Sequence, residues 1–298
     1  MGGTRIKIAE VEGADIVQSA NVQTPVGEGP ERILDQVAAA VRALNPAPHE
    51  LGMAIPGEVD ATGRCWRLPN IPGFDGFEIA RELSERTGAR VTIENDGTTA
   101  AYGEALFGHG RTHASFLVVT LGTGIGGGLV LGRRLIRGSH GFAAEVGHVT
   151  IDSSPDARIC SCGNRGCLEA YAGTRGLILS FEEAGGGAVA EIVPIAESAY
   201  RTEAAGVAVF DSMADALAIG LNSVQNVLDL DAIVFTGGIS KSFDLIEPRL
   251  RHGLRTRCYA KVLAEVPLLV SELGDVAGVV GAAYLPTLER AIPVEPAP

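Results

Sequence analysis

The stretch Cys160-Ser-Cys-Gly-Asn-Arg-Gly-Cys-Leu-Glu169 carries the most specific pattern of the chain, and Glu145-Val-Gly-His148 lies shortly before it. Three cysteine thiolates and one imidazole form the ligand set of a closed tetrahedral zinc site. The spacing predicts such a site, with the ligands His148, Cys160, Cys162 and Cys167. A purely structural zinc knuckle is the simpler interpretation. Two acids beside the ligands, Glu145 and Glu169, favour a substrate pocket shaped by the metal.

Composition limits the classes of function. The 298 residues are 46% hydrophobic, which is enough for a large core, and a chain of this length usually forms two domains. A formal net charge of -12 disfavours nucleic acid or an anionic membrane as partner. No apolar run reaches the roughly 18 residues of a spanning helix, and no export signal is evident. We therefore expect a cytoplasmic protein that acts on small molecules.

The first half alternates strand and helix patterns. Strands are expected at Arg5–Val11, His49–Ile55 and Arg90–Ile93, and helices at 30–44 and 77–87. The third strand runs directly into Glu94-Asn-Asp-Gly-Thr98. Ligands of open α/β sheets bind at the carboxyl ends of the strands, so this polar segment is a candidate site.

The second half repeats the alternation. A strand at Ala114–Thr120 leads into Leu121-Gly-Thr-Gly-Ile-Gly-Gly-Gly128, and Leu129–Ile136 is expected to return as the second strand of a hairpin. A long helix is expected from about Val207 to Leu228. After it, a strand at Ala232–Phe235 ends in Thr236-Gly-Gly-Ile-Ser240. A strand at 267–271 and a helix from Val276 follow.

Three glycine turns beside strands suggest a polyphosphate site. Glycines let successive backbone N–H groups converge on an anion, and a threonine hydroxyl adds a donor. Each turn alone is more often an ordinary tight turn, and none matches the GxxxxGK[ST] or GxGxxG patterns. Together they predict that a nucleotide is held by Gly2, Gly3, Thr4, Gly122, Thr123, Gly124, Gly237 and Gly238.

Taken in order, these motifs resemble those of the ROK family of sugar kinases. The matching segments cover almost the whole chain and are Gly2-Gly-Thr4, Pro56-Gly-Glu-Val-Asp60, Leu68-Pro-Asn-Ile-Pro-Gly73, Glu94-Asn-Asp-Gly-Thr98, Leu121-Gly-Thr-Gly-Ile-Gly-Gly127, Glu145-Val-Gly-His148, the cysteine stretch and Thr236-Gly-Gly238. The resemblance implies an α/β, two-lobed actin-like ATPase (ribonuclease H-like) fold, with mixed sheets flanked by helices. Residues 1–112 would form the N-terminal lobe, completed by a C-terminal helix at about 284–298. Residues 113–283 would form the lobe with the zinc site.

The resemblance also implies a reaction, the phosphorylation of a hexose by ATP with Mg²⁺. Asp96 would be the general base that takes the proton of the attacking sugar hydroxyl. From the residues alone, Asp96 could equally be the cap of a helix that begins at Gly97. The sugar would be bound by Gly57, Asn70, Asn95, Asp96, Glu145, His148 and Glu169. The Zn²⁺ would be structural, with His148 holding metal through one ring nitrogen and facing substrate with the other.

Several alternatives stay open. Glucose is the leading substrate, and N-acetylmannosamine, N-acetylglucosamine and fructose offer hydroxyls to the same acceptors. Polyphosphate is a less favoured donor, and a repressor of the same family is disfavoured because no basic recognition helix is present. A homodimer or homotetramer is expected from the resemblance.

The first phosphate turn departs from the family pattern. Similar kinases carry an Asp two residues before the Gly-Gly-Thr turn, at the end of a first strand, whereas here Met1 stands directly before Gly2. One hypothesis is that Met1 is an internal methionine of a longer protein; another is a catalytically impaired sugar-binding protein. Two smaller departures are Arg5, where Lys is common, and Thr98, where Asn is common.

Overall fold

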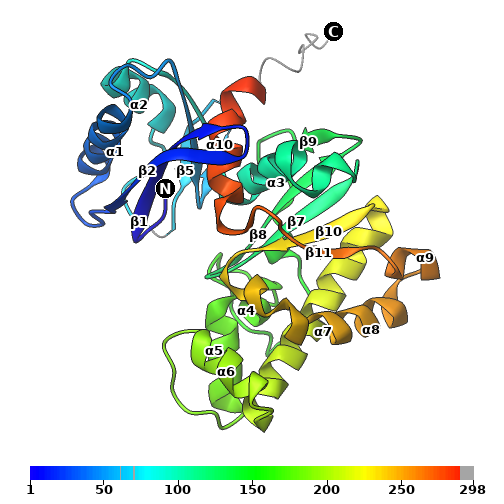
Figure 1. Ribbon diagram of the computed structural model, residues 1–298. Coiled ribbons are helices and arrows are strands. Elements are labelled where there is room, and N and C mark those ends of the chain that lie inside the picture. Colours follow the sequence, from blue (N-terminus) through cyan, green and yellow to red (C-terminus); the bar gives the residue numbers. More distant parts are fainter. Residues whose placement is uncertain (61, 70, 289–298) are drawn as a thin grey trace. The chain divides into compact units, whose positions relative to one another are not determined.

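The computed structural model describes residues 1–60, 62–69 and 71–288, and these residues divide into two compact units (Figure 1). Unit 1 contains Met1–Thr112, Gly128–Ala143 and the segment from Val276 onward, and unit 2 contains His113–Gly127 and Ala144–Asp275. The sequence-based division assigned residues 128–143 and 276–283 to the second lobe. In the structure both segments pack with unit 1.

Within residues 1–112 of unit 1, the described strands form three two-stranded sheets. The strands β1 (Arg5–Glu12) and β2 (Asp15–Gln23) make an antiparallel hairpin, and β4 (Glu58–Val59) pairs antiparallel with β5 (Cys65–Arg67). The strands β3 (Glu50–Ile55) and β6 (Arg90–Asn95) are parallel, with Ile55 opposite Asn95. The predicted strands at the start of the chain, at His49–Ile55 and at Arg90–Ile93 are therefore present.

The helices of unit 1 are α1 (Pro30–Leu44), α2 (Ile79–Thr87), α3 (Asp96–Phe107) and α10 (Ala277–Leu288), with a short 3-10 turn η1 (His109–Arg111). Pro30 occupies the first turn of α1, where its missing N–H costs nothing. Gly88 ends α2 with a left-handed backbone. The apolar faces of both helices join β1, β3 and β6 in one buried cluster that includes Ile6, Leu34, Ile55, Leu83 and Ile93.

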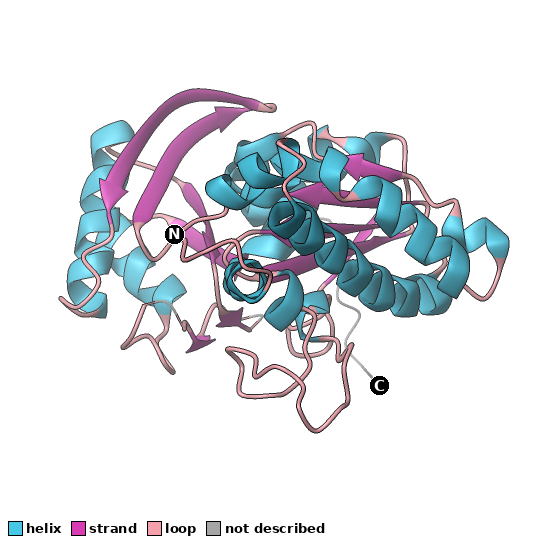
Figure 2. Cartoon of the chain, turned by 90° about the horizontal axis from the view of Figure 1, so that it is seen from below, coloured by secondary structure: helices cyan, strands magenta, loops and turns pink. Residues whose placement is uncertain are grey.

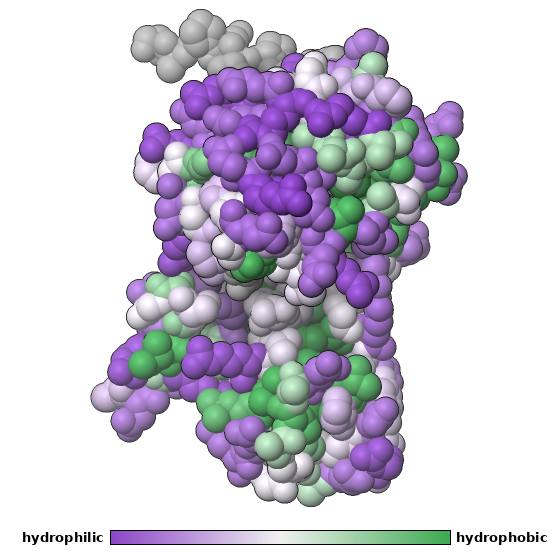
Figure 3. All heavy atoms as spheres, turned by 90° about the vertical axis from the view of Figure 1, so that its left-hand side faces the viewer, coloured by the Kyte–Doolittle hydropathy of each residue, from purple (hydrophilic) through white to green (hydrophobic). Residues whose placement is uncertain are grey.

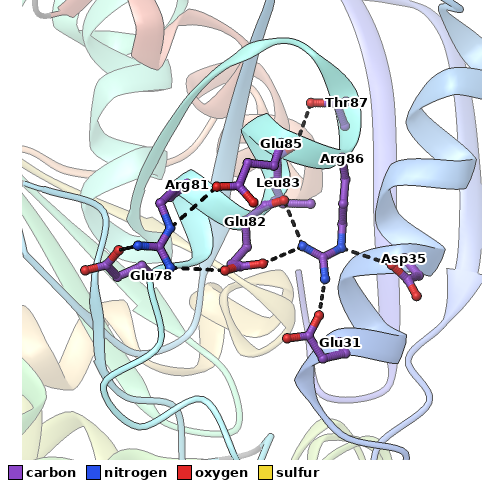
Figure 4. Close-up of polar contacts among 9 residues, drawn as sticks. All are labelled: Glu31, Asp35, Glu78, Arg81, Glu82, Leu83, Glu85, Arg86 and Thr87. Atoms are coloured by element: carbon purple, nitrogen blue, oxygen red, sulfur yellow. Dashed lines mark hydrogen bonds and ion pairs between the residues drawn. The ribbon is translucent and has the colours of Figure 1, made fainter.

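Ion pairs connect α1 to α2 on the surface of unit 1. Figure 4 shows Arg86 of α2 reaching Glu31 and Asp35 of α1 as well as Glu82 of its own helix. Arg81 contacts Glu82 and Glu85 of α2, and also Glu78, the residue just before this helix. In Figure 3 the upper part of the molecule, which carries these helices and the β1–β2 hairpin, is largely hydrophilic.

Glycine allows α3 and α10 to touch through their backbones. A Cβ atom on Gly103 would collide with the carbonyl of Ala277, and one on Gly281 would collide with the carbonyl of Thr99. The same helix α10 also packs against β3. The helix that begins at Asp96 is thus held in place by a helix from the far end of the chain.

The main sheet has the strand order β11-β10-β7-β8-β9. Its strands are β7 (Phe116–Leu121), β8 (Ile125–Leu131), β9 (Arg134–Ile136), β10 (Ala232–Thr236) and β11 (Leu268–Val270). The strand β10 runs parallel to both β7 and β11, whereas β8 and β9 are antiparallel. Leu129–Ile136 was predicted as one return strand, and this was wrong. Gly132 and Arg133 both have positive φ and make a tight turn between β8 and β9.

Helices and short turns complete unit 2, and Figure 2 shows helices lying beside its strands. They are η2 (Val146–His148), α4 (Glu169–Ala172), α5 (Thr174–Glu183), α6 (Val193–Tyr200), α7 (Ala204–Leu228), η3 (Gly238–Leu245), α8 (Glu247–Arg257) and α9 (Lys261–Ala264), followed at the border of the units by η4 (Gly274–Val276).

The helix α7 departs from the expectation that no segment is long and apolar enough to span a membrane. By length and composition alone it meets that test. More than half of its most apolar window is buried inside the protein, where Phe210, Met213, Leu217 and Leu221 contribute to the core. Burial of this kind is typical of a core helix, which satisfies the same criteria.

Candidate active site

Asp96 lies at the junction of β6 and α3 in unit 1. Asn95 is the last residue of the strand and Asp96 the first of the helix. The cap of α3 is Asn95, whose Oδ1 accepts hydrogen bonds from the backbone N–H groups of Gly97 at 2.8 Å and Thr98 at 3.2 Å. The capping role that the sequence left open for Asp96 is therefore filled by its neighbour.

Asn95 also ties the helix to the loop after β3. Its Nδ2 donates to the carbonyl oxygen of Gly57 at 3.2 Å. This brings two predicted sugar-binding positions, Gly57 and Asn95, into direct contact. The Asn95 amide has a second hydrogen, and no acceptor for it is found among the described residues. The third predicted sugar contact of this region, Asn70, lies outside the described residues.

The environment of Asp96 raises the pKa of its carboxyl group. Its side chain is accessible to solvent, yet protein atoms surround it densely, and this displacement of water raises the pKa of its carboxyl group above the ordinary value. The nearby N-terminal ammonium group and the N–H of Gly97 act in the opposite direction without cancelling the effect. A carboxylate whose proton affinity is raised by its surroundings is suited to act as a general base.

A buried ion pair lies next to the junction of β6 and α3. Glu94, the residue before Asn95, is 1% exposed, and its Oε2 accepts from Nε of Arg137 in the segment after β9. Its Oε1 accepts from the backbone N–H of Asn95 at 2.9 Å. Burial raises the pKa of Glu94, and Arg137 lowers it in part. The pair therefore fixes the end of β6 at the point where Asp96 begins α3.

We expect Arg137→Met to destabilise unit 1 by about 3 kcal/mol at pH 7, because it leaves the Glu94 carboxylate buried without its partner. Urea unfolding followed by the fluorescence of Trp66, the only tryptophan and a residue of unit 1, measures the change. The matched control is Arg134→Met, which removes an exposed arginine of β9 and should change stability by less than about 0.5 kcal/mol. Equal losses in both variants would contradict a stabilising role of the pair.

The first predicted phosphate turn lies before β1. Its Gly2 N–H donates to the carbonyl of Arg5 at 3.0 Å, and its Gly2 carbonyl accepts from Oγ1 of Thr24 at 2.6 Å. Gly2 is therefore used within the protein. Among the residues that the structure describes, the N–H groups of Gly3 and Thr4 have no acceptor and are the donors of this turn that an anion could use.

The other two predicted phosphate turns lie at the carboxyl ends of two neighbouring strands of the main sheet. The strands β7 and β10 are parallel neighbours, with Thr236 opposite Thr120, so the Gly122–Gly124 turn and the Gly237–Gly238 turn follow adjacent strand ends. Gly237 has positive φ and lies against the carbonyl of Leu121, where a side chain would not fit. This is the edge at which parallel α/β sheets bind ligands.

The Gly122–Gly124 turn is shorter than the glycine-rich run suggested. Gly126–Gly128 already belong to β8, and the turn is closed by a hydrogen bond from Gly122 N–H to the Gly124 carbonyl at 3.0 Å. Thr174, the first residue of α5, donates from its N–H and its Oγ1 to the carbonyl of Gly122. Within the described residues, Thr123 and Gly124 retain N–H groups available to a phosphate.

The predicted zinc ligands converge in unit 2. His148 ends η2, and the three cysteines lie in the loop between η2 and α4, which is braced by the bridges Thr150 with Cys167 and Ile159 with Arg165. The four ligand atoms all lie within 4.8 Å of one another.

The distances in the cluster fit zinc. A tetrahedral ion with Zn–S bonds of about 2.3 Å places two sulfurs about 3.8 Å apart. The Sγ atoms of Cys162 and Cys167 are 3.8 Å apart, and Nδ1 of His148 is 3.6 Å from Sγ of Cys160. Burial and the neighbouring thiols raise the pKa of Cys167 to about 12, so a cation bound in the cluster has to displace the proton of this thiol. The other ring nitrogen of His148 stays available to a second partner.

Glu169 links the zinc loop to the glycine turn. It is the first residue of α4, and Oε1 accepts from the hydroxyl of Ser161 at 2.6 Å. Its Oε2 accepts from the N–H of Ile125 at 3.1 Å, directly after the Gly122–Gly124 turn. Glu145, the other predicted sugar acid, caps η2, and its carbonyl accepts from His148 N–H.

The predicted site residues therefore form two groups. In unit 1 the structure joins Gly57, Asn95 and Asp96, and in unit 2 it joins the zinc ligands, Glu169 and the second glycine turn. Sequence reasoning did not find Ser161, Arg137 or Thr174. The contacts of Arg137 and Thr174 join residues 43 and 52 positions apart, beyond the range of a local spacing pattern. Ser161 lies in the cysteine stretch itself, but a serine there belongs to no ligand pattern.

Comparisons with known proteins bear on these features. The chain matches the model of the ROK family over residues 1–288. A glucokinase of Thermotoga maritima is 30% identical to it over 96% of this chain and 95% of the relative. An N-acetyl-D-glucosamine kinase of Pasteurella multocida is 31% identical over 96% of this chain and 97% of the relative.

A solved structure gives the same result. The ROK family glucokinase of Streptomyces griseus, in complex with glucose and AMPPNP, superposes with a TM-score of 0.81 and 31% identity, covering 96% of each chain. The predicted α/β fold of the actin-like ATPase type is thereby confirmed. The chain belongs to the ROK family and is a glucokinase-like member of it.

Proposed function

We propose that the protein transfers the γ-phosphoryl group of ATP to a hexose, and that glucose, converted to glucose 6-phosphate, is its main substrate. The observation that carries the proposal is the state of Asp96. Its carboxylate is accessible, its pKa is raised, and Asn95 relieves it of capping α3. The similarity to glucokinases supports the choice of reaction and sugar.

In the proposed reaction Asp96 accepts the proton of the sugar hydroxyl while that oxygen bonds to the γ-phosphorus. The bond from the γ-phosphorus to the bridging oxygen breaks, and ADP leaves. Such transfers require positioning and charge stabilisation more than covalent chemistry by the protein. The N–H groups of the turns containing Gly3, Thr4, Thr123 and Gly124, together with the edge at Gly237 and Gly238, would hold the phosphates and the nucleotide. Mg²⁺ would arrive with ATP, because this ion keeps waters and phosphate oxygens as ligands.

The sugar acceptors of this proposal are the polar positions expected from the sequence, namely Gly57, Asn70, Asn95, Glu145, His148 and Glu169. Carboxylates accept hydrogen bonds from neighbouring hydroxyls, and several fixed acceptors reject sugars of the wrong configuration. Zinc would be structural and would fix the loop between His148 and Glu169. We place the enzyme in the cytoplasm, as a homodimer or homotetramer.

An ADP-release assay with a panel of hexoses tests the proposal. We expect glucose to give the highest kcat/KM, and N-acetylmannosamine, N-acetylglucosamine and fructose to give lower values. A higher value for an N-acetylhexosamine would replace glucose as the substrate, and the relative from Pasteurella multocida makes that outcome a specific alternative. Binding of glucose without ADP release from any sugar would identify a sugar-binding protein without kinase activity.

A further inference from the structure

The Glu169 carboxylate is held from two sides within unit 2. The Ser161 hydroxyl donates to Oε1 at 2.6 Å, and the Ile125 N–H donates to Oε2 at 3.1 Å. The approach on the second side is so close that a Cβ atom on Gly124 would collide with Oε2. One carboxylate therefore connects the loop of the cysteines to the turn that follows β7.

Ser161 is the donor on the zinc side that persists when the cysteines hold a metal. Sγ of Cys160 also lies 3.6 Å from Oε1 and can donate to it as a thiol. A thiolate that binds a metal has no proton to donate. The Ser161 hydroxyl then remains as the link, and its position is fixed because it lies between two ligands, Cys160 and Cys162.

The Gly122–Gly124 turn is bound by residues at the junction of α4 and α5. Besides the bond from Ile125 to Glu169, the carbonyl of Gly122 accepts two hydrogen bonds from Thr174, which follows α4 after one residue. The turn is thus anchored on its two sides by residues at the α4–α5 junction. A carboxylate released on the Ser161 side can rotate, and the anchor at Ile125 then weakens.

We propose that Ser161 is a positioning residue that orients Glu169, so that the zinc loop and the Gly122–Gly124 phosphate turn behave as one structural element. Its substitution should then affect the nucleotide as well as the sugar, although Ser161 lies in the zinc loop. This inference rests on the proposed function for its ligands, and its structural part can be measured without any ligand.

The ligand-free test is amide hydrogen exchange. In Ser161→Ala the segment that contains Ile125 should exchange about 3- to 10-fold faster than in the parent protein, because a hydrogen bond to a charged acceptor is weakened. Zinc content should stay the same, and Ser161→Thr, which keeps the hydroxyl, should restore slow exchange. The control is Ser153→Ala, an exposed serine of the same loop. Unchanged exchange at Ile125 in Ser161→Ala would overturn the proposal.

The ligand test is calorimetric titration with glucose and with MgADP. We expect Ser161→Ala to weaken both affinities about 3- to 10-fold, and Ser153→Ala to weaken neither. A loss confined to glucose would refute the coupling to the phosphate turn. If the parent protein binds no hexose, the proposed function fails, whereas exchange at Ile125 and the MgADP titration still decide the role of Ser161.

Discussion

Asp96→Asn should lower kcat by about 10²- to 10⁴-fold and should leave unit 1 at least as stable as before. The rate falls because an amide cannot accept the proton of the sugar hydroxyl, and positioned general bases contribute about this much. Sugar and nucleotide affinities should change little, since Asn retains the shape and polarity of Asp. The loss should therefore appear in kcat, measured by ADP release, rather than in KM.

The stability expectation follows from the raised pKa of Asp96. A carboxyl group whose pKa is higher in the folded than in the unfolded protein favours folding less as pH rises from about 3.9, its unfolded value, through the folded value. At pH 7 the ionised Asp96 is thus a cost that Asn removes. Urea unfolding monitored by Trp66 should give Asp96→Asn an equal or higher midpoint at pH 7, and no advantage well below pH 4.

The same pKa predicts the acid limb of the rate profile. The kcat/KM of the parent enzyme should fall with decreasing pH through a value above the ordinary range of Asp, because the protonated carboxyl cannot act as base. The contrasting variant is Asn95→Ala, which removes the α3 cap and should destabilise unit 1 by about 1 kcal/mol. If Asp96→Asn instead lost stability like Asn95→Ala and retained turnover, Asp96 would be structural.

Removal of zinc should reduce hexose phosphorylation to background and be reversible on adding the metal back. Backbone hydrogen bonds around the two isolated bridges shape the loop of the three cysteines, but none of them joins the four ligand side chains to one another. We therefore expect the metal to hold these side chains in their common arrangement. Binding of a structural zinc ion contributes free energy to the folding of its site. His148 and Glu169 lie at the two ends of this loop. Chelation, with zinc content measured by mass spectrometry beside ADP release, should show loss and recovery in parallel.

A matched pair of variants separates the metal from general thiol effects. Cys162→Ser should lose zinc and activity, because a serine hydroxyl is a poor zinc ligand. Cys258→Ser changes a partly buried thiol outside the cluster and should keep both. Full turnover by zinc-free protein would show that the pocket does not need the ion.

The sequence predicts those parts of the molecule whose causes are local. The zinc ligands follow from short spacing, and the strands and helices follow from hydrophobic period and from residues such as Pro30 and Gly88. The choice between Asn95 and Asp96 as cap was not predictable, since both can cap a helix and the outcome depends on where β6 ends.

Longer-range features had no sequence signal. The ion pair of Arg137 with Glu94 joins residues 43 positions apart and arises only when separate segments fold together. The assignment of residues 128–143 to unit 1 is of the same kind. A Cβ atom on Gly128 would collide with Gly97 and Ala101 of α3, so this segment lies against that helix.

The packing of α10 on α3 has a consequence for the order in which the two units fold during synthesis. A ribosome delivers α3 early and all of unit 2 before α10. Domains usually fold in the order of synthesis, at about 5–20 residues per second. Unit 2 is therefore the part that can fold first on the ribosome. The helix that begins at Asp96 is packed only later, when Gly281 reaches the backbone of Thr99. A nascent chain would hold the helix α3 without its partner until translation of α10 is complete, and we expect a chain cut short before α10 to be inactive although every predicted site residue is present.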